Sequence, residues 1–258
     1  MRHLYPLTAH ELGKHFDLER ACDRGLLPSI YFSDDPNADL AAYVGTYLQQ
    51  EIVSEAAARN VPAFSRFLKV AADCNATIVN FTNVANDAQV PRTTVYEYFH
   101  ILRDTLLLDE LPAWRTRTGR KPIVSSKYYF FDIGVTRYLQ GRTFAPGTKE
   151  FGEAFETLLF MELTAWREYA AGAPPLSFWR STSGFEVDFL IGDNVAVEVK
   201  AKAHIGDRDL RSLRALSQEA ARRHLVCVCL EARPRRVDGI DILPWPEFLL
   251  RLWAGEYR

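Results

Sequence analysis

Residues 185–200 read Phe-Glu-Val-Asp-Phe-Leu-Ile-Gly-Asp-Asn-Val-Ala-Val-Glu-Val-Lys, and they carry the clearest structural signal in the C-terminal part of the chain. Polar and apolar side chains alternate on either side of Gly-Asp-Asn, which is typical of two strands joined by a tight turn. A three-residue turn pairs Ile191 with Val195 and sets Asp188 opposite Glu198. A register shifted by one residue would place Glu198 beside an apolar side chain, so the hydrophobic pattern favours this pairing. The apolar face then carries Val187, Phe189, Ile191, Val195, Val197 and Val199, and the other face carries Asp188, Glu198 and Lys200.

Two carboxylates that face each other across a hairpin repel, so the sequence predicts a positive charge between Asp188 and Glu198. The ammonium group of Lys200 is one candidate. A divalent cation held by oxygen ligands, as Mg²⁺ is, is the other. A catalytic or metal-binding site and a purely structural salt-bridge cluster both stay open, because clusters of perturbed charge are functional in only some proteins.

The spacing of Asp188 and Glu198-x-Lys200 resembles the signature of the PD-(D/E)XK, or restriction endonuclease-like, nuclease superfamily. Val187 stands where a proline often precedes the aspartate in that superfamily. The predicted order of elements agrees with the superfamily core, which is a helix, three strands, a second helix and a further strand. These elements are expected at residues 151–170, 176–180, 185–191, 195–200, 207–223 and 225–230.

The resemblance implies that Asp188 and Glu198 bind Mg²⁺ and that Lys200 orients or activates the water that attacks a phosphodiester. It also implies a glutamate from the first helix as a further metal ligand or supporting group. Glu156 is the candidate, rather than Glu153, because its neighbours on the helix are mostly apolar and an unpaired carboxylate is costly there. The predicted catalytic residues are therefore Asp188, Glu198, Lys200 and Glu156, and the predicted metal ligands are Glu156, Asp188 and Glu198.

The composition is that of an ordinary globular protein. The 258 residues, 48% hydrophobic and 25% charged, are enough for two modest domains. No apolar run reaches the length of a membrane span, and the start of the chain lacks a secretory signal. The four cysteines, Cys22, Cys74, Cys227 and Cys229, have the spacing of reduced, buried residues, so a cytoplasmic location is expected. His10 and His15 are five residues apart rather than the four of an H-E-x-x-H zinc site.

Residues 73–127 predict a winged helix. A helix at 81–88, a turn at 89–91 and a longer helix that begins at Pro91 form the helix-turn-helix, and the two extended segments that follow, at 106–113 and 122–125, form a wing. We expect DNA contacts from the start of the second helix and from the basic wing tip. The predicted contacts are Arg92, Thr93, Thr94 and Tyr96 on the helix and Arg115, Arg117, Arg120 and Lys121 on the wing. A protein–protein spacer is the alternative, because the acids Asp104, Asp109 and Glu110 leave the module nearly neutral.

The N-terminal third predicts helices. Thr8 and Glu11 have the spacing of a capping box, and a long helix is expected at residues 38–57, followed by a helix around Phe64–Leu68. Several phrases along the whole chain resemble the C-terminal region of a large prokaryotic family of AAA-type ATPases. The phrases are Gly-Leu-Leu-Pro-Ser-Ile30, Tyr-Leu-Gln-Gln-Glu-Ile52, Phe-Ser-Arg-Phe-Leu68, Thr-Thr-Val-Tyr-Glu-Tyr98, Lys-Tyr-Tyr-Phe-Phe-Asp132-Ile-Gly, Phe-Glu156 and Glu-Val-Asp-Phe189.

The resemblance implies a winged helix followed by a C-terminal domain of unknown function with a nuclease-like fold. The chain lacks the G-x-x-x-x-G-K-[ST] loop that cradles nucleotide phosphates, so we expect neither ATP binding nor ATPase activity. The predicted fold is an α/β (α+β) fold in three segments: helical remnant or linker of an ATPase module at 1–72, winged helix at 73–127, and nuclease-like mixed sheet flanked by helices at 140–258.

The expected function is DNA binding with a Mg²⁺-dependent nuclease-like domain. The alternative is a non-catalytic module that binds DNA or a protein for an ATPase-related system, with a degenerate nuclease fold. The expected partners are DNA and either another protein or a second copy that covers apolar surface of the N-terminal helices. No membrane association is expected.

Overall fold

A computed structural model describes residues 3–48, 60–114, 126–170, 172–220 and 224–258 of the chain. The chain divides into two compact units, and neither is continuous in sequence. Unit 1 comprises Met1–Phe16, Leu111–Val124 and Gly147–Arg258, and unit 2 comprises Asp17–Glu110 and Ser125–Pro146. The boundaries of these two units differ from those of the three segments predicted from the sequence, and the three-segment division stays a prediction.

Unit 1 is built on a six-stranded mixed sheet in the order β4-β5-β6-β7-β9-β8. The β4–β5, β5–β6 and β8–β9 pairs are antiparallel, and the β6–β7 and β7–β9 pairs are parallel. The strands are β4 (Leu176–Arg180), β5 (Glu186–Ile191), β6 (Val195–Lys200), β7 (His224–Cys229), β8 (Arg235–Val237) and β9 (Ile240–Pro244). The parallel pairs require crossovers, which the chain makes through helices after β6 and through β8 after β7.

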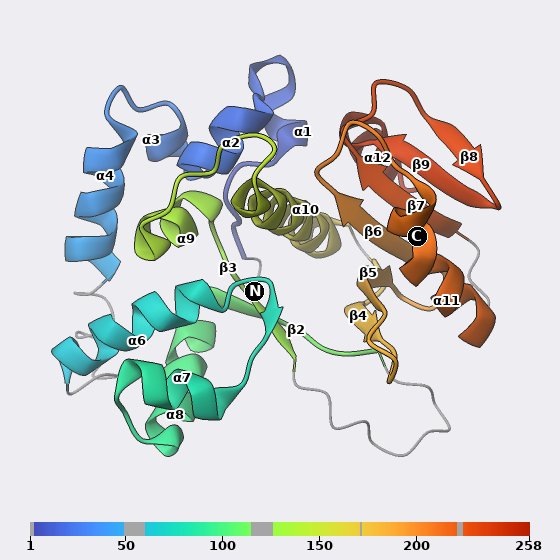
Figure 1. Ribbon diagram of the computed structural model, residues 1–258. Helices are drawn as coiled ribbons and strands as arrows, with labels where there is room; N and C mark the ends of the chain where they lie inside the picture. The colour runs from blue at the N-terminus through green and yellow to red at the C-terminus, as the bar shows by residue number, and fades with distance from the viewer. Residues whose placement is uncertain (1–2, 49–59, 115–125, 171, 221–223) are drawn as a thin grey trace. The chain divides into compact units, whose positions relative to one another are not determined.

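Helices flank the sheet of unit 1, as the sequence predicts (Figure 1). The longest, α10 (Lys149–Tyr169), lies against β6, and its Phe160 meets Phe189 of the neighbouring β5 with ring centroids 6.1 Å apart. The helix α11 (Arg211–Glu219) packs its Leu213 and Leu216 with Leu190 of β5 in a second buried cluster. The remaining helical elements are α1 (Ala9–Leu12), η1 (Gly13–His15), η3 (Asp207–Leu210) and α12 (Trp245–Trp253). The α+β class with a mixed C-terminal sheet is therefore confirmed.

The hairpin of β5 and β6 has the predicted register. Ile191 pairs with Val195 and Phe189 with Val197 across the three-residue turn. On its other side, β5 contains a β-bulge, because Leu190 pairs with Ser177 while Val187 pairs with Trp179. The bulge gives β5 one more residue than β4 over this interval, so Val187 and Leu190 pack in the same buried cluster. The prediction of strict alternation is therefore wrong for Val187.

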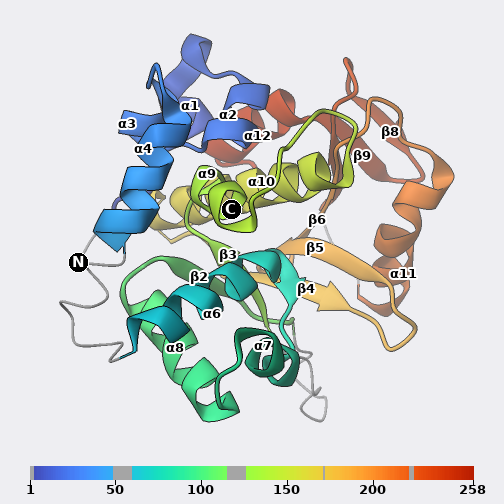
Figure 2. The ribbon, with the colours of Figure 1, turned by 60° about the vertical axis from the view of Figure 1, so that its left-hand side comes forward.

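Unit 2 is mostly helical, and α6, α7 and α8 pack together in it (Figure 2). Its helical elements are α2 (Leu18–Arg24), α3 (Pro28–Tyr31), α4 (Pro36–Ala42), η2 (Tyr43–Leu48), α6 (Val61–Asp73), α7 (Phe81–Ala88), α8 (Arg92–Asp104) and α9 (Ile133–Gln140). A three-stranded sheet in the order β1-β3-β2 joins them and comprises β1 (Thr77–Ile78), β2 (Leu108–Leu111) and β3 (Lys127–Phe130).

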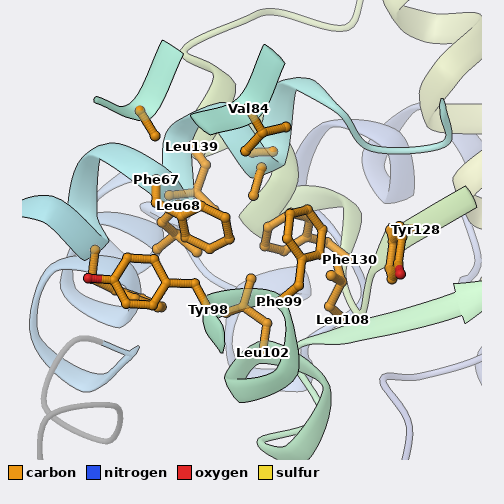
Figure 3. Close-up of a cluster of buried hydrophobic side chains, with 14 of the residues drawn as sticks. Phe67, Leu68, Val84, Tyr98, Phe99, Leu102, Leu108, Tyr128, Phe130 and Leu139 are labelled. Carbon is orange, nitrogen blue, oxygen red and sulfur yellow. The ribbon is translucent and has the colours of Figure 1, made fainter. Parts of the chain in front are cut away.

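Aromatic side chains form the core of unit 2 (Figure 3). Phe67 of α6 meets Tyr98 and Phe99 of α8 with ring centroids 5.1 Å and 5.3 Å apart. Phe130 of β3 is fully buried in the same cluster. The Phe67–Phe99 pair is edge-to-face, and a pair of this kind adds about 1 kcal/mol beyond the area that it buries. The core therefore fixes α6, α8 and β3 together.

Two observations in unit 2 differ from the sequence predictions. The predicted long helix at 38–57 changes to a π-helix at Tyr43, at the end of α4, and residues 49–59 lie outside the described part of the chain. A glycine at position 45 lowers helix propensity there. Lys127, the last residue of the segment predicted as a winged helix and the first of β3, is only 2% exposed, so its side chain is not available on the surface of a wing.

Asp132 links the start of α9 to the turn after α2. Its carboxylate caps α9 by accepting from the Val135 N–H at 3.0 Å, and it also accepts from the Leu26 N–H at 2.7 Å. Complete burial is the main reason that the pKa of Asp132 is raised to about 6. The backbone comes so close that a Cβ on Gly134 would lie 2.0 Å from the Arg24 carbonyl oxygen. Two of the segments that resemble the ATPase family, residues 25–30 and 127–134, therefore contact each other here, and their contact has a structural role.

No helix in the described ranges combines the length and apolarity that crossing a bilayer requires. The four cysteines are all free thiols.

Candidate functional site

Asp188 lies in the β5 bulge with its carboxylate directed at β6. Its Oδ2 accepts from the backbone N–H of Val199 at 2.8 Å, and the residue is 8% exposed. The main-chain pairing of the two strands ends at Phe189 and Val197. The side chain of Asp188 therefore takes the place of a main-chain acceptor where the strands separate, and bulges commonly redirect side chains in this way.

Glu198 and Lys200 lie on the face of β6 that α11 covers. The alternation along β6 places them with Ala196, which packs in the α11 cluster. Lys200 Nζ donates to Glu198 Oε1 at 2.5 Å, with the two side chains 28% and 5% exposed respectively. Glu198 Oε2 is buried and has no hydrogen-bond partner among the described residues. An acceptor without a donor at this depth costs about 1–3 kcal/mol, so Glu198 Oε2 is the atom of this strand edge that a bound cation or donor would satisfy.

The electrostatics of the site follow from burial and from the neighbouring carboxylates. Burial, and next the charge of Asp188, raise the pKa of Glu198 well above its ordinary value, whereas Lys200 lowers it and Glu156 adds a smaller increase. Burial lowers the pKa of Lys200, but the charges of Glu198 and Asp188 outweigh this and raise it. Lys200 therefore keeps its proton, and negative charge is in excess around Glu198.

The three predicted metal ligands are not all brought together. No group of three or more His, Cys, Asp or Glu side chains in the described ranges is arranged to hold a metal ion. Glu156 is half-buried on α10 and acts on Glu198 through its charge. Asp188 and Glu198 do lie at one strand edge, and Mg²⁺ is often held by one or two protein carboxylates together with waters and substrate phosphates. The unpartnered Glu198 Oε2 fits such an ion, and the three-ligand set stays a prediction.

The predicted nucleic-acid contacts on α8 lie at its first turns. Arg92, Thr93 and Tyr96 are exposed and Thr94 is half-buried. Arg92 Nη2 donates to the Tyr96 hydroxyl at 2.8 Å, and the Tyr96 ring stacks on Phe81 of α7 with centroids 4.4 Å apart. These contacts hold an exposed aromatic ring and a guanidinium side by side, a pairing that suits stacking on bases and contact with phosphates.

The predicted wing contacts, Arg115, Arg117, Arg120 and Lys121, lie outside the described residues. One of the acids that weakened the DNA interpretation is neutralised, because Glu110 forms an ion pair of 2.6 Å with Arg103 and accepts from the Ser126 hydroxyl at 2.5 Å. Arg103 belongs to α8, so this contact joins α8 to β2.

Sequence reasoning missed two groups of residues in unit 1. Lys202 lies two residues after Lys200 and forms an ion pair of 2.5 Å with Asp209 of η3; the spacing of the two lysines was the available signal. Glu162 is 1% exposed and binds residues from both ends of the chain, which no local pattern reveals. Beside it lies a cavity of about 270 Å³ lined by Ala9, His10, Gly13, Phe16, Trp245, Pro246, Leu249, Leu250 and Trp253.

Comparison with known proteins matches the two units separately. The family model described as Domain of unknown function (DUF8612) matches residues 15–145, just over half of the chain, and these residues nearly coincide with unit 2. The model described as Domain of unknown function (DUF4143) matches residues 151–248 of unit 1. No solved structure matches.

Two curated mycobacterial proteins are also similar to this chain. They are Uncharacterized protein Mb2031c of Mycobacterium bovis and Uncharacterized protein Rv2008c of Mycobacterium tuberculosis. Each is 24% identical over 192 residues, which cover 72% of this chain and 42% of the relative. The chain therefore spans about two-fifths of the length of these relatives.

Proposed function

We propose that this chain, which belongs to the family described as Domain of unknown function (DUF8612), binds DNA and carries in unit 1 a nuclease-like site for Mg²⁺-assisted phosphodiester hydrolysis. The observation that carries the proposal is the strand edge where Asp188, Glu198 and Lys200 meet, with Glu198 Oε2 buried and unpartnered. A strand edge with two buried carboxylates and one lysine supports the resemblance to the PD-(D/E)XK superfamily. The sheet flanked by helices supports it as well.

The residues of the edge have distinct roles in this proposal. Asp188, oriented by the Val199 N–H, and Glu198 would hold the ion, with Glu156 close enough to add charge. When bound, Mg²⁺ stabilises charge on the phosphate and lowers the pKa of a coordinated water. Lys200 keeps its proton in this setting, so it serves as a hydrogen-bond donor to a phosphate oxygen or to the attacking water and not as the base that deprotonates the water.

Unit 2 would hold the DNA through a winged helix. The succession α6, β1, α7, α8, β2, β3 with the sheet order β1-β3-β2 supports this assignment. The second helix of the pair, α8, would place Arg92, Thr93, Thr94 and Tyr96 at the groove, and the wing residues Arg115, Arg117, Arg120 and Lys121 would contact phosphates. Unit 2 would position the duplex, and unit 1 would cut it.

The second candidate is a non-catalytic module that binds DNA or protein. It is favoured by the short contact between Lys200 and Glu198, because that lysine already neutralises the more buried carboxylate. Under either proposal ATP is not a ligand, since the nucleotide-binding loop is absent from the sequence. An ATPase or a second copy of the chain would be the protein partner, through the helices of residues 1–72.

Thermal melts with Mg²⁺ or Mn²⁺ and with a chelator test the strand edge. The parent should melt at a higher temperature with the metal, because an ion that binds only the folded state stabilises it. Glu198→Gln should abolish this increase, and Glu168→Gln, which removes a charge at the far end of α10, should retain it. Metal-insensitive melts throughout would leave the non-catalytic module as the function.

Duplex binding tests unit 2. Replacing Arg115, Arg117, Arg120 and Lys121 together by Ala should weaken binding to every sequence and flatten its salt dependence. Each phosphate contact that is lost reduces by about one the number of counterions that the DNA releases on binding. Arg92→Ala should weaken binding as well. If the parent protein binds no duplex at any salt concentration, the DNA proposal fails and the protein-binding module takes its place.

A further inference from the structure

The loop that follows β6 holds Lys202 on a fixed backbone. The Lys202 N–H donates to the Lys200 carbonyl at 2.7 Å, and the Lys202 carbonyl accepts from the Leu230 N–H at 2.9 Å. Further along, the Ile205 N–H donates to Glu231 Oε1 at 2.8 Å, and the Ile205 side chain is buried. Because the backbone is bonded on both sides of Lys202, the loop presents this side chain at a defined place beside the end of β6.

Arg235 of β8 holds the same loop in place through hydrogen bonds. Its guanidinium donates to both oxygens of Glu231 at 2.8 Å and to the Ile205 carbonyl at 2.7 Å. The hydrogen bonds from Arg235 are the main reason that the pKa of Glu231 is lowered to about 2. The clamp of Glu231 and Arg235 is therefore charged, and holds the loop, at any pH at which the protein would be assayed.

Lys202 extends from this loop to Asp209 of η3. Its Nζ donates to Asp209 Oδ1 at 2.5 Å, and Asp209 Oδ2 accepts from the Gly206 N–H at 3.0 Å. Burial raises the pKa of Asp209, but the Lys202 hydrogen bond, then the Gly206 N–H and then the charges of Lys202 and Lys200 bring it below its ordinary value. Two ammonium groups thus lie near one carboxylate. The side chain of Lys200 is 28% exposed and that of Lys202 is 55% exposed.

We propose that Lys202 binds the phosphate next to the one at the Glu198–Lys200 edge, so that the site takes a polynucleotide strand in preference to an isolated phosphodiester. This inference rests on the proposed function, because it requires a phosphodiester at that edge. The lysine end of this pair is exposed to solvent although the Asp209 side chain is only 13% exposed, so Lys202 can leave Asp209 for a phosphate without uncovering buried surface of its own. Asp209 keeps its hydrogen bond from Gly206 when Lys202 leaves.

The competing role for Lys202 is to neutralise Asp209 and so to stabilise the loop. In that case its loss would affect every substrate alike, through the position of Lys200. A phosphate-binding role affects only substrates that have a second phosphate. The two roles are therefore separated by comparing a substrate that has one phosphodiester with a substrate that has many.

The experiment measures kcat/KM with Mn²⁺ on bis(4-nitrophenyl) phosphate and on a duplex oligonucleotide. We expect Lys202→Ala to lower kcat/KM about tenfold on the oligonucleotide, mainly through KM, and to leave the small diester within about twofold. Lys202→Arg should retain the parent values on both substrates. The matched control is Arg236→Ala, which also removes an exposed cation paired with an aspartate, Asp241, but on the strand at the far edge of the sheet.

If Lys202→Ala loses kcat/KM equally on both substrates, or loses none on the oligonucleotide, the phosphate-binding role of Lys202 is overturned. Hydrolysis by the parent would still support the proposed function. A parent that hydrolyses neither substrate with any divalent cation overturns the proposed function and this inference with it. A control variant that loses as much as Lys202→Ala would assign the effect to overall charge and would also overturn the inference.

Discussion

Glu162 of α10 is fully buried in unit 1 and joins segments that are far apart in the sequence. Its Oε1 accepts from the Ala9 N–H in a very short hydrogen bond, and its Oε2 accepts from Trp253 Nε1 at 3.2 Å. Burial is the main cause that raises its pKa to about 7; the two hydrogen bonds act in the opposite direction, and the charge of Glu11 adds to the increase. A carboxyl group with this pKa titrates within the physiological range.

The raised pKa predicts that Glu162 makes folding pH-dependent. Because the folded-state pKa lies above the ordinary one, the contribution of this group to stability is complete below about pH 4.5 and is lost as the pH rises through about 7. The free energy of unfolding of the parent should fall by roughly 2 kcal/mol between pH 5 and pH 8 from this group alone. Urea unfolding at several pH values should show a flatter profile for Glu162→Gln, whereas Glu168→Gln should keep the parent profile.

Gly134 has no side chain, and this lets its backbone pack closely against the backbone of Arg24 beside Asp132. An added Cβ would lie 2.0 Å from the Arg24 carbonyl oxygen, which belongs to the backbone and cannot move aside cheaply. Gly134→Ala should therefore destabilise the protein by about 2 kcal/mol or more. Gly152→Ala is the control, since a Cβ there meets nothing within 4 Å and a helical glycine replaced by alanine should gain about 1 kcal/mol. Equal effects in thermal melts would contradict the close approach.

At the scale of elements, the β5 bulge gives Asp188 a structural role besides any chemical one. Its carboxylate satisfies the Val199 N–H, so Asp188→Ala should strand that buried donor and cost about 1–3 kcal/mol. Asp188→Asn keeps an acceptor oxygen and should cost less. Both variants should lose any stabilisation by Mg²⁺. Unfolding measurements with and without the ion therefore separate the two roles, and equal costs for Ala and Asn without metal would contradict the hydrogen bond.

The same elements show what the sequence could and could not predict. The turn Gly192-Asp193-Asn194 and the alternation beside it were enough to predict the pairing of Ile191 with Val195. The bulge was not predictable, because Val187 and Phe189 alternate in sequence as they would in a regular strand. It arises from the pairing with β4, which is a tertiary contact. The hairpin register that sets Asp188 opposite Glu198 was therefore predictable, but the bulge that directs the Asp188 carboxylate was not.

At the scale of the whole molecule, the helices and strands were easier to predict than their grouping into units. The strands β4, β6 and β7 and the helices α6, α7, α8 and α10 lie close to where periodicity placed them. The sequence gives no local signal that residues 1–16 belong with residues 147–258, because the contacts of Ala9 with Glu162 and of Phe16 with Trp245 join distant positions. Predicting the N-terminal residues as part of a separate helical segment follows from that lack of signal.

The contact of the first helix with the last has a consequence for the order of events on the ribosome. Every residue of unit 2 is synthesised before α12, so unit 2 can fold while the rest of the chain is still being made. The helix α1 is synthesised before α12, and synthesis of the intervening residues takes on the order of tens of seconds. During that interval the apolar side of α1 lacks the helix that covers it in the folded unit, and we expect chaperones that bind exposed apolar segments of nascent chains to recognise it.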